Sequence, residues 1–350
     1  MMTDLPIVTS KPFHDQAAAV RAMGSPFVAA VLDAVGRQLA RAPLTSALVA
    51  DWPRDEAADA LAMRVAGALH ALARAGDDAA LALLYRDRTG DMDRTIGDAL
   101  ARADAFVADW IRDPPQTNEV GRTAATMAAL MVLRARFAMP CALLELGASA
   151  GLNLNLTRYA HDLGGVAAGD AASPVRIAPD WRGPPPPAHA VEIASARGVD
   201  LHPLAADEQD ARDRLMAFVW PDDAARADRL SAALRIARDA PPRVDRGNVV
   251  DWLPAQLAEP QPAGTCRVVV HSMVLQYLAP AARAAVEDAL AIAGARATAE
   301  RPLARIGFEW TPARDAVRLR LTSWPDGRTV DLATCHAYGA WIDWHQQEAR

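Results

Sequence analysis

The sequence predicts an α/β protein, in which a helical N-terminal region is followed by a mostly parallel sheet and a closing antiparallel hairpin. Residues 12–138 repeat apolar side chains at helical spacing, and residues 139–310 alternate short apolar runs with amphipathic stretches. Two alternating segments then flank an Asp-Gly turn at 326–327, as in a β-hairpin. We therefore expect a helical region over residues 1–138 and an α/β domain over residues 139–350.

The composition excludes several classes of protein. The chain has 350 residues, of which 51% are hydrophobic, and its net charge of −6 argues against a general nucleic-acid binder. No stretch reaches the ~18 consecutive apolar residues of a membrane-spanning helix. The first residues, which include Asp4 and Pro6, lack the basic start and apolar run of a signal peptide. We expect a cytoplasmic protein with a small-molecule partner and with neither a nucleic-acid nor a membrane partner, and the oligomeric state stays open.

The three cysteines, Cys141, Cys266 and Cys335, are scattered along the chain without a Cys-x-x-Cys pair. Such spacing is typical of buried free thiols in a reducing compartment and not of a metal site. No metal is expected.

The N-terminal region is expected to supply helices and no chemistry of its own. Gly24-Ser25-Pro26, Pro43 and Pro53 separate its amphipathic stretches. The predicted helices cover residues 13–22, 26–40, 55–75 and 96–111, and a last one ends near residue 137.

A polar segment interrupts these helices. Residues 114–122 read PPQTNEVGR and bring together Gln116, Thr117, Asn118 and Glu119. One interpretation is a helix cap, with Thr117 or Asn118 as the capping residue and Glu119 in the first turn. The other places Gln116 and Asn118 at the mouth of a ligand site, because a cap needs only one such residue.

The stretch 143–153, LLELGASAGLN, is the clearest candidate for a ligand site. An apolar strand passes through Glu145 and small residues into an amphipathic pattern that begins at Leu152. This geometry lets backbone approach a nucleotide-like ligand closely. The stretch lacks the G-x-G-x-x-G dinucleotide fingerprint, and the only lysine of the chain is Lys11, so the phosphate-binding Walker motif is absent as well.

A first crossover helix is expected over residues 152–159, and an irregular proline-rich insertion over residues 160–190. A second strand then ends at Asp200, in the sequence GVDLHP. Asp200 has two interpretations, a ligand-binding carboxylate at the end of the strand or a helix cap or turn residue. Further helices are predicted over residues 207–218 and 224–240.

Two more strands end in polar residues. Residues 243–253 read as a third strand and turn that ends in Asn248 and Asp251. Residues 267–278 contain the clearest buried strand of the chain, whose β-branched run Val268–Val270 ends in His271 and Ser272 before an apolar helix start. His271 and Ser272 end that valine run, where ligands bind in open α/β sheets, and Gln276 and Tyr277 lie a turn further on. A lone histidine is also commonly a structural residue. A helix over 281–297, a strand over 304–310 and hairpin strands over 316–324 and 329–336 complete the prediction.

Two resemblances add to this interpretation. The stretches PPQTNEVGR, LLELGASAGLNL, GVDLHP, FVWPD and VVVHSMVLQYL resemble a bacterial family called domain of unknown function 2332, over nearly the whole chain. Residues 141–344 resemble class I S-adenosylmethionine-dependent methyltransferases, whose first motif is acidic-x-Gly-x-Gly-x-Gly. Ser149 stands here at the middle glycine.

The second resemblance implies a Rossmann-like sheet and an S-adenosylmethionine site, with Asp200 on the ribose hydroxyls and Asn248 or Asp251 at the adenine. The remaining cofactor contacts that we expect are Glu145, Gly147, Ser149, Gly151 and Ser272. The expected activity is methyl transfer to a small molecule, with His271 as the candidate base and Glu119 and Glu309 as weaker candidates. The substrate mouth is expected at Gln116, Asn118, Gln276 and Tyr277. The alternative is a methyltransferase-like scaffold that binds a ligand or a protein without catalysis.

Overall fold

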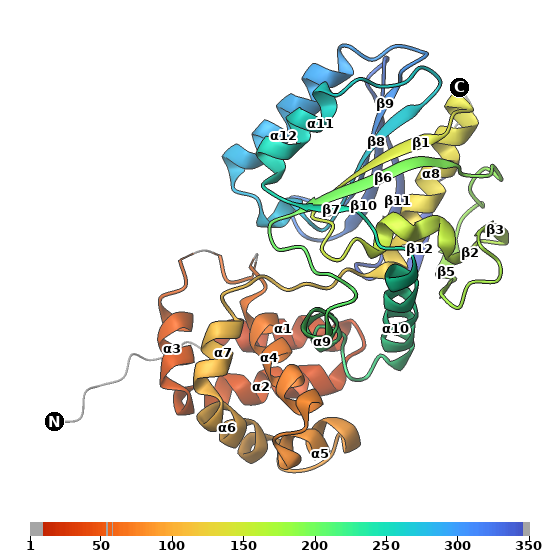
Figure 1. Cartoon of the computed structure of the whole chain (residues 1–350). Coiled ribbons are helices and arrows are strands. Elements are labelled where there is room, and N and C mark those ends of the chain that lie inside the picture. Colours follow the sequence, from red (N-terminus) through yellow and green to blue (C-terminus); the bar gives the residue numbers. More distant parts are fainter. Residues whose placement is uncertain (1–9, 54, 58, 346–350) are drawn as a thin grey trace. The chain divides into compact units, whose positions relative to one another are not determined.

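The computed structural model describes residues 10–53, 55–57 and 59–345 (Figure 1). The expectation that concerned Asp4 and Pro6 lies outside these residues. The chain divides into two compact units, of which the first comprises Met1–Thr117 and Gln209–Asp228 and the second Asn118–Glu208 and Arg229–Arg350. This division differs from the predicted one in two places. Residues 118–138 belong with the sheet, and residues 209–228 belong with the N-terminal helices.

The first unit is helical, as predicted. Its helices are α1 (Lys11–Ala22), α2 (Pro26–Gln38), η1 (Leu39–Arg41), α3 (Pro43–Ala50), α4 (Leu61–Ala75), α5 (Ala79–Asp87), α6 (Met92–Arg102), α7 (Asp104–Trp110) and α9 (Gln209–Ala217). The single helix predicted over 96–111 is wrong, since the chain breaks at Ala103 between α6 and α7. Helices α3 and α5 were not predicted, because each is shorter than the three turns that make periodicity visible.

The second unit is built on a nine-stranded sheet in the order β5-β12-β11-β10-β9-β8-β1-β6-β7. Strands β7, β6, β1, β8 and β9 are mutually parallel, as predicted. β10 and β11 form the predicted antiparallel hairpin, and β12 and β5 extend the sheet beyond it. The bounds are β1 (Cys141–Leu146), β5 (Asp180–Arg182), β6 (Ile193–Asp200), β7 (Val244–Arg246), β8 (Cys266–Ser272), β9 (Leu303–Trp310), β10 (Val317–Trp324), β11 (Arg328–Cys335) and β12 (Trp341–Trp344).

Helices cover both faces of this sheet (Figure 1). One face packs against α11 (Val249–Ala258) and α12 (Pro280–Gly294), in a core that contains Leu144 and Leu146 of β1 and Val269 of β8. The other face carries α8 (Thr123–Phe137), which η2 (Val120–Arg122) precedes. Successive residues of a strand point to opposite faces, so Glu145 lies on the α8 face. α10 (Ala224–Asp239) begins in the first unit and ends in the second.

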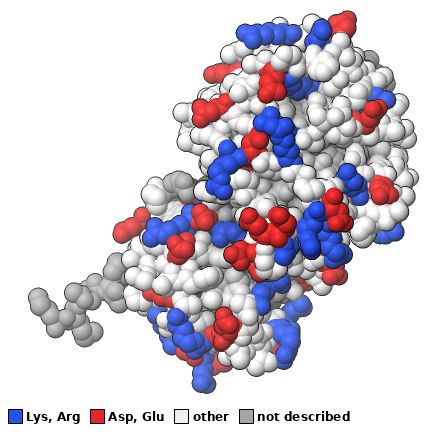
Figure 2. Space-filling view, in the orientation of Figure 1, with Lys and Arg blue, Asp and Glu red and all other residues white. Residues whose placement is uncertain are grey.

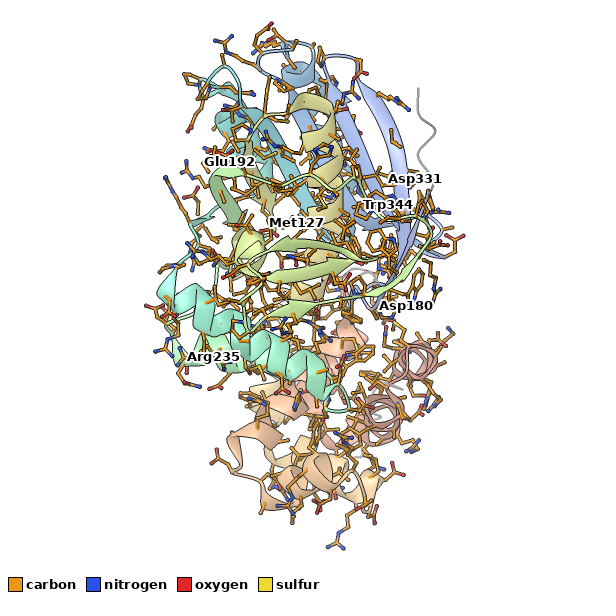
Figure 3. All side chains as sticks on the ribbon, turned by 90° about the vertical axis from the view of Figure 1, so that its right-hand side faces the viewer. Met127, Asp180, Glu192, Arg235, Asp331 and Trp344 are labelled. Carbon is orange, nitrogen blue, oxygen red and sulfur yellow. The ribbon has the colours of Figure 1, made fainter. Side chains whose placement is uncertain are left out.

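The insertion between β1 and β6 is more regular than predicted. Its strands β2 (Ala160–Leu163), β3 (Val166–Gly169) and β4 (Arg176–Ile177) form a small sheet in the order β3-β2-β4. Figure 3 looks onto this side of the molecule, where β2 packs against α8, the helix marked by Met127. The predicted first crossover helix is instead a 3-10 helix, η3 (Leu152–Arg158).

The third strand is shorter than predicted, whereas the fourth ends where predicted. The third strand stops at Arg246, and residues 249–253 open α11, because Asn248 caps that helix by accepting a hydrogen bond from the Val250 N–H. The fourth strand stops at Ser272, as the sequence predicted, and the chain continues into the 3-10 helix η4 (Leu275–Tyr277). Met273 has a positive φ of 59°, which ends the extended backbone at that point.

The surface carries charges of both signs. Figure 2 shows arginine side chains interspersed with aspartate and glutamate side chains on the face in view. None of the helices in the described ranges is long and apolar enough to cross a membrane.

Candidate functional site

The candidate site lies where the order of the parallel strands reverses. From β1 the chain proceeds outward through β6 to β7 on one side, and then returns to β8 and β9 on the other side. The carboxyl ends of β1 and β8 therefore flank a topological switch point, which is where ligands bind in open α/β sheets. The loop of residues 147–151 follows β1 at this point.

Three residues of the loop have left-handed backbone, with φ of 66° at Gly147, 56° at Ser149 and 68° at Gly151. A side chain at 147 would lie 2.5 Å from a Val274 methyl carbon, and one at 151 would lie 2.7 Å from Val244. The two glycines are therefore required by the backbone and by packing within the protein. Glycine is the residue that tolerates both conditions at little steric cost.

The backbone N–H groups from Ala148 to Leu152 donate within the protein. Ala148 donates to the Val199 carbonyl (3.0 Å) and Gly151 to the Ala148 carbonyl (2.7 Å). Ser149 donates to Oδ2 of Asp200 (2.8 Å). Ala150 and Leu152 both donate to Oδ1 of Asn118, each at 3.1 Å. Five successive donors are thus already in use.

Asp200 ends β6 beside the loop, as the sequence predicted. In addition to Ser149, it accepts a hydrogen bond on Oδ1 from the His202 N–H (2.9 Å). A carboxylate has about four acceptor positions, so each oxygen retains one. Asp200 therefore fits both of its sequence interpretations, the turn residue and the ligand-binding carboxylate.

The polar segment before α8 joins the site through Asn118 and Glu119. Asn118, at φ 33°, caps the glycine loop and not its own helix. Glu119 caps η2 by accepting from the Gly121 N–H (2.9 Å), and it pairs with Arg229 (3.4 Å). Gln116 is buried and belongs to the first unit.

Glu145 lies beneath the loop with 4% of its surface exposed. Its Oε1 accepts a hydrogen bond from Nδ2 of Asn153 (3.3 Å). Burial raises the pKa of Glu145 to about 8, and the negative charge of Asp200 acts in the same direction. Within the described residues, neither Oε2 of Glu145 nor Oδ1 of Asn153 has a hydrogen-bond partner.

His271 lies on the opposite face of the sheet. Its ring stands over Gly307, where a side chain would approach within 2.9 Å of the ring. Nδ1 lies 2.7 Å from Oε1 of Glu309, and Nε2 accepts a hydrogen bond from Nε of Arg305 (2.9 Å). Arginine only donates, so the ring proton is on Nδ1. Both nitrogens are occupied, and the ring is 1% exposed.

Glu309 also organises the chain after β8. Its Oε1 accepts hydrogen bonds from the backbone N–H groups of Val274 (3.0 Å) and Leu275 (3.4 Å). Val274 in turn packs against Gly147. The structure thus brings together His271 and Glu309 as a pair, but the sheet separates both from Glu145.

The other predicted residues have these surroundings. Ser272 accepts a hydrogen bond from Nη1 of Arg122 (3.3 Å), on the face that carries α8. Gln276 donates to the Met273 carbonyl (3.2 Å) and accepts from Arg314 (3.1 Å), and Tyr277 is 39% exposed. Asn248 is the cap of α11, and Asp251 lies in its first turn.

Three participants were not predicted. Asn153 ends the loop motif and meets Glu145, Arg122 meets Ser272, and Arg305 meets His271. Asn153 was within reach of sequence reasoning, because a polar residue directly after the small-residue loop returns toward the strand. The two arginines carry no such signal, since the chain is rich in exposed arginine.

A protein-family comparison covers nearly the whole chain. The model of a family described as "Uncharacterized protein conserved in bacteria (DUF2332)" matches residues 10–344. The chain belongs to this family. Membership confirms the first resemblance and carries no assigned reaction. Among curated proteins and among solved structures, none matches the chain.

Proposed function

We propose that the second unit binds S-adenosylmethionine at the loop after β1 and transfers its methyl group to a small-molecule acceptor. The observation that carries the proposal is the hydrogen bonding of this loop. Its N–H groups from Ala148 to Leu152 are used within the protein, whereas acceptors remain on Glu145, Asn153 and Asp200. A ligand that fits such a site brings donors and no phosphate.

This pattern disfavours the common nucleotide cofactors. Phosphate and pyrophosphate groups bind where free backbone N–H groups point at the ligand. An adenosyl compound without phosphate offers instead an amino group and two ribose hydroxyls. The hydroxyls fit the remaining acceptor positions of Asp200, one on each oxygen.

An apolar surface for the base follows Asp200 directly. Leu201, which follows Asp200 in sequence, exposes 59% of its surface. Because Leu201 adjoins the carboxylate proposed to bind the ribose, it is placed to pack against the attached adenine. Asn248 and Asp251 keep their predicted role as alternatives for the adenine amine.

The chemistry required of the chain is mainly positioning. S-adenosylmethionine supplies a methyl group on a sulfonium, which an acceptor displaces in line. The chain would hold the adenosyl end on Asp200 and Leu201 and orient the acceptor, which contributes through proximity. We do not assign proton removal to His271, because both of its nitrogens are engaged on the other face.

A second candidate is a scaffold that binds the same ligand without catalysis. One observation favours it: each of the three predicted acid–base residues is committed to structural contacts. His271 and Glu309 bond to each other, and Glu119 caps η2 and pairs with Arg229. An acceptor that needs no base, such as a thiolate, would still be compatible with catalysis.

Calorimetry with S-adenosylhomocysteine, NAD and ADP tests the binding site. We expect S-adenosylhomocysteine to bind and the two phosphate-bearing ligands to bind weakly or not at all. Asp200→Ala should weaken the binding of S-adenosylhomocysteine by about 1.5–3 kcal/mol per charge-assisted bond lost. Asp331→Asn on β11 is the control. Lower stability with unchanged affinity in Asp200→Ala would assign Asp200 to the turn alone and contradict the ribose contact.

Methyl-labelled S-adenosylmethionine separates the two candidate functions. Incubation with a small-molecule extract should place label in a metabolite with the wild type and not with Asp200→Ala. Saturable binding without any labelled product across such extracts would favour the scaffold.

A further inference from the structure

Arg122 and Ser272 meet at the carboxyl end of β8. Nη1 of Arg122 donates to the hydroxyl oxygen of Ser272 (3.3 Å), and its Nε donates to the Ala337 carbonyl (2.8 Å). The guanidinium carbon also lies 6.0 Å from the ring centre of Phe308 and 5.9 Å from that of Tyr338. Only 8% of the surface of Arg122 is exposed. These contacts fix the plane of a side chain that stays positively charged at every physiological pH.

The hydroxyl proton of Ser272 has no acceptor. Its oxygen accepts from Arg122, but no acceptor in the described ranges takes the proton that this hydroxyl can donate. The side chain is partly buried, so water reaches it only in part. A structural role for Arg122 explains the bonds of the guanidinium and leaves this donor without a role. A fixed positive charge beside a hydroxyl donor is an arrangement that binds anions.

This contact lies one strand away from the glycine loop. Leu146 of β1 pairs with His271 of β8, so Ser272 is level with Gly147, where the loop begins. Neighbouring strands of a sheet are about 4.8 Å apart. Phe308 of β9 pairs with Ser272 on the side away from β1. A small molecule that is anchored at Ser272 is therefore within reach of a ligand bound at the loop.

The charges around Arg122 also favour an anion. Glu119, three positions earlier in the chain, pairs with Arg229 (3.4 Å). The Nη2 atom of Arg229 would lie 3.6 Å from a side chain at Gly121, the neighbour of Arg122. Two arginines thus accompany one acid at η2. The two sides of the site differ accordingly, since Asp200 presents acceptors whereas Arg122 and Ser272 present donors.

We propose that Arg122 and Ser272 bind a carboxylate of the methyl acceptor, which is therefore an organic acid. Arginine binds carboxylates through parallel N–H···O bonds in one plane, and the serine hydroxyl supplies a further donor. The proposal assigns Ser272 to the acceptor and not to the cofactor. It rests on the proposed function, because it names the class of acceptor for the same site.

The carboxylate serves as an anchor, and another atom of the acid takes the methyl group. A lone pair of that atom forms the new bond to the methyl carbon, while the bonding pair between carbon and sulfur returns to sulfur. S-adenosylhomocysteine leaves as the neutral thioether, and a proton on the attacking atom passes to water. Because the carboxylate is not consumed, the methylated product keeps its negative charge.

Fractionated extracts test the class of acceptor. A small-molecule extract is separated on an anion exchanger at pH 7, and each fraction is incubated with the protein and methyl-labelled S-adenosylmethionine. We expect label only in products from the retained fraction, and these products should again be retained. Coupling of that fraction to methylamine with a carbodiimide, which converts carboxylates to amides, should abolish labelling. Treatment with phosphatase should leave labelling unchanged.

Two variants test the residues. Ser272→Ala removes the hydroxyl donor at little risk to the fold, and Arg122→Gln removes the charge. In each, the amount of retained fraction that gives the half-maximal rate should rise about 10- to 100-fold, as for loss of a hydrogen bond to a charged group. The affinity for S-adenosylhomocysteine should stay that of the wild type. Arg136→Gln is the matched control, since Arg136 also donates to a serine hydroxyl, that of Ser323 (3.1 Å).

The outcomes separate this inference from the proposed function. Label from the unretained fraction, a base-labile methyl ester as the product, or loss of labelling after phosphatase would overturn the carboxylate anchor and leave the S-adenosylmethionine site standing. An unchanged half-maximal amount in Ser272→Ala would do the same. Label from neither fraction, with S-adenosylhomocysteine bound, would overturn the inference in favour of the scaffold. A protein that does not bind S-adenosylhomocysteine would overturn the proposed function, and this inference with it.

Discussion

At the scale of single residues, the polar side chains at the ends of the strands divide between two roles. Those on the α12 face complete each other, since Glu309 and Arg305 occupy the two nitrogens of His271. On the α8 face, Ser272 has a partner in Arg122, whereas one oxygen each of Glu145 and Asn153 has no hydrogen-bond partner among the described residues. A buried network with every partner present stabilises a fold, whereas a missing partner needs an explanation such as strain, a bound water or a ligand.

We expect the effects of His271 and Glu309 on the free energy of unfolding to depend on each other, and neither residue to affect ligand binding. A double-mutant cycle with His271→Leu and Glu309→Leu should give a coupling free energy of about 0.5–3 kcal/mol, because each single change leaves a buried partner unsatisfied. Chemical denaturation measures the free energies of unfolding. A coupling indistinguishable from zero, or a His271→Leu protein that folds normally but loses S-adenosylhomocysteine, would contradict the structural role.

Glu145 should make stability depend on pH. Its ordinary pKa is 4.5, and the folded chain raises that pKa to about 8. Between these values the folded chain keeps a proton that the unfolded chain has released. The stabilisation is therefore fully present below pH 4.5 and is lost as the pH rises towards 8, with a slope of at most about 1.4 kcal/mol per pH unit.

The measurement is the free energy of unfolding of wild type and Glu145→Gln from pH 5 to pH 8. We expect the difference between the two proteins to shift against the wild type as the pH rises. Burial lowers the pKa values of His70 and His161 to about 4, so these two residues make the folded chain more stable as the pH rises towards 6.5. Both proteins contain the two histidines, so their contribution cancels in the comparison. Parallel pH profiles would show that Glu145 does not carry the proton.

At the scale of elements, the short segment before α8 acts as a clamp on the glycine loop. Asn118 accepts from two N–H groups of the loop, and its left-handed backbone is one that asparagine tolerates better than most residues. The loop would otherwise leave two buried donors at the start of η3. Asn118, from the polar segment that the sequence singled out, is thus part of the site through its support of the loop.

We expect Asn118→Gly to loosen that loop locally. Glycine accepts the backbone angle but removes the acceptor, so the amides of Ala150 and Leu152 lose their partner at a cost of about 1–3 kcal/mol each. Hydrogen exchange of these two amides should accelerate. Asn248→Gly, which removes the equivalent bond to Val250 at the start of α11, is the control and should leave the loop protected. Unchanged exchange at Ala150 and Leu152 would refute the clamp.

At the scale of the whole molecule, the nine-stranded sheet is what buries the thiols. Cys141 and Cys266 lie opposite each other on β1 and β8, and Cys335 ends β11. Each has at most 3% of its surface exposed. For Cys141 and Cys266, parallel strands covered by helices on both faces leave little access from solvent.

A thiol reagent should therefore report on unfolding of the sheet. We expect Ellman's reagent to modify none of the three cysteines quickly in the native protein and all three in denaturant. The rate in the native protein should follow the opening of the sheet and fall when S-adenosylhomocysteine is bound, because a ligand that binds only the folded state stabilises it. A thiol that reacts at once in native conditions would contradict the burial.

The sequence alone determined the class of fold, because the spacing of apolar residues that distinguishes helices from strands is a local pattern. A few neighbouring residues were enough to indicate three elements: the valines 268–270, the strand end at Asp200 and the Asp-Gly turn. The structure confirms each of them, as β8, the end of β6 and the β10–β11 hairpin. Local signals failed where elements are short or where a cap competes with a strand, as at α3, α5 and Asn248.

Only the tertiary structure decided which candidate residues meet. His271 and Ser272 are neighbours in sequence, yet the two-residue period of a strand sends one to Arg305 and the other to Arg122, on opposite faces. Asn118 and Ala150 are 32 positions apart and share a hydrogen bond. Whether a buried acid finds a partner depends on such distant contacts, so the unpaired oxygen of Glu145 became visible only in the folded chain.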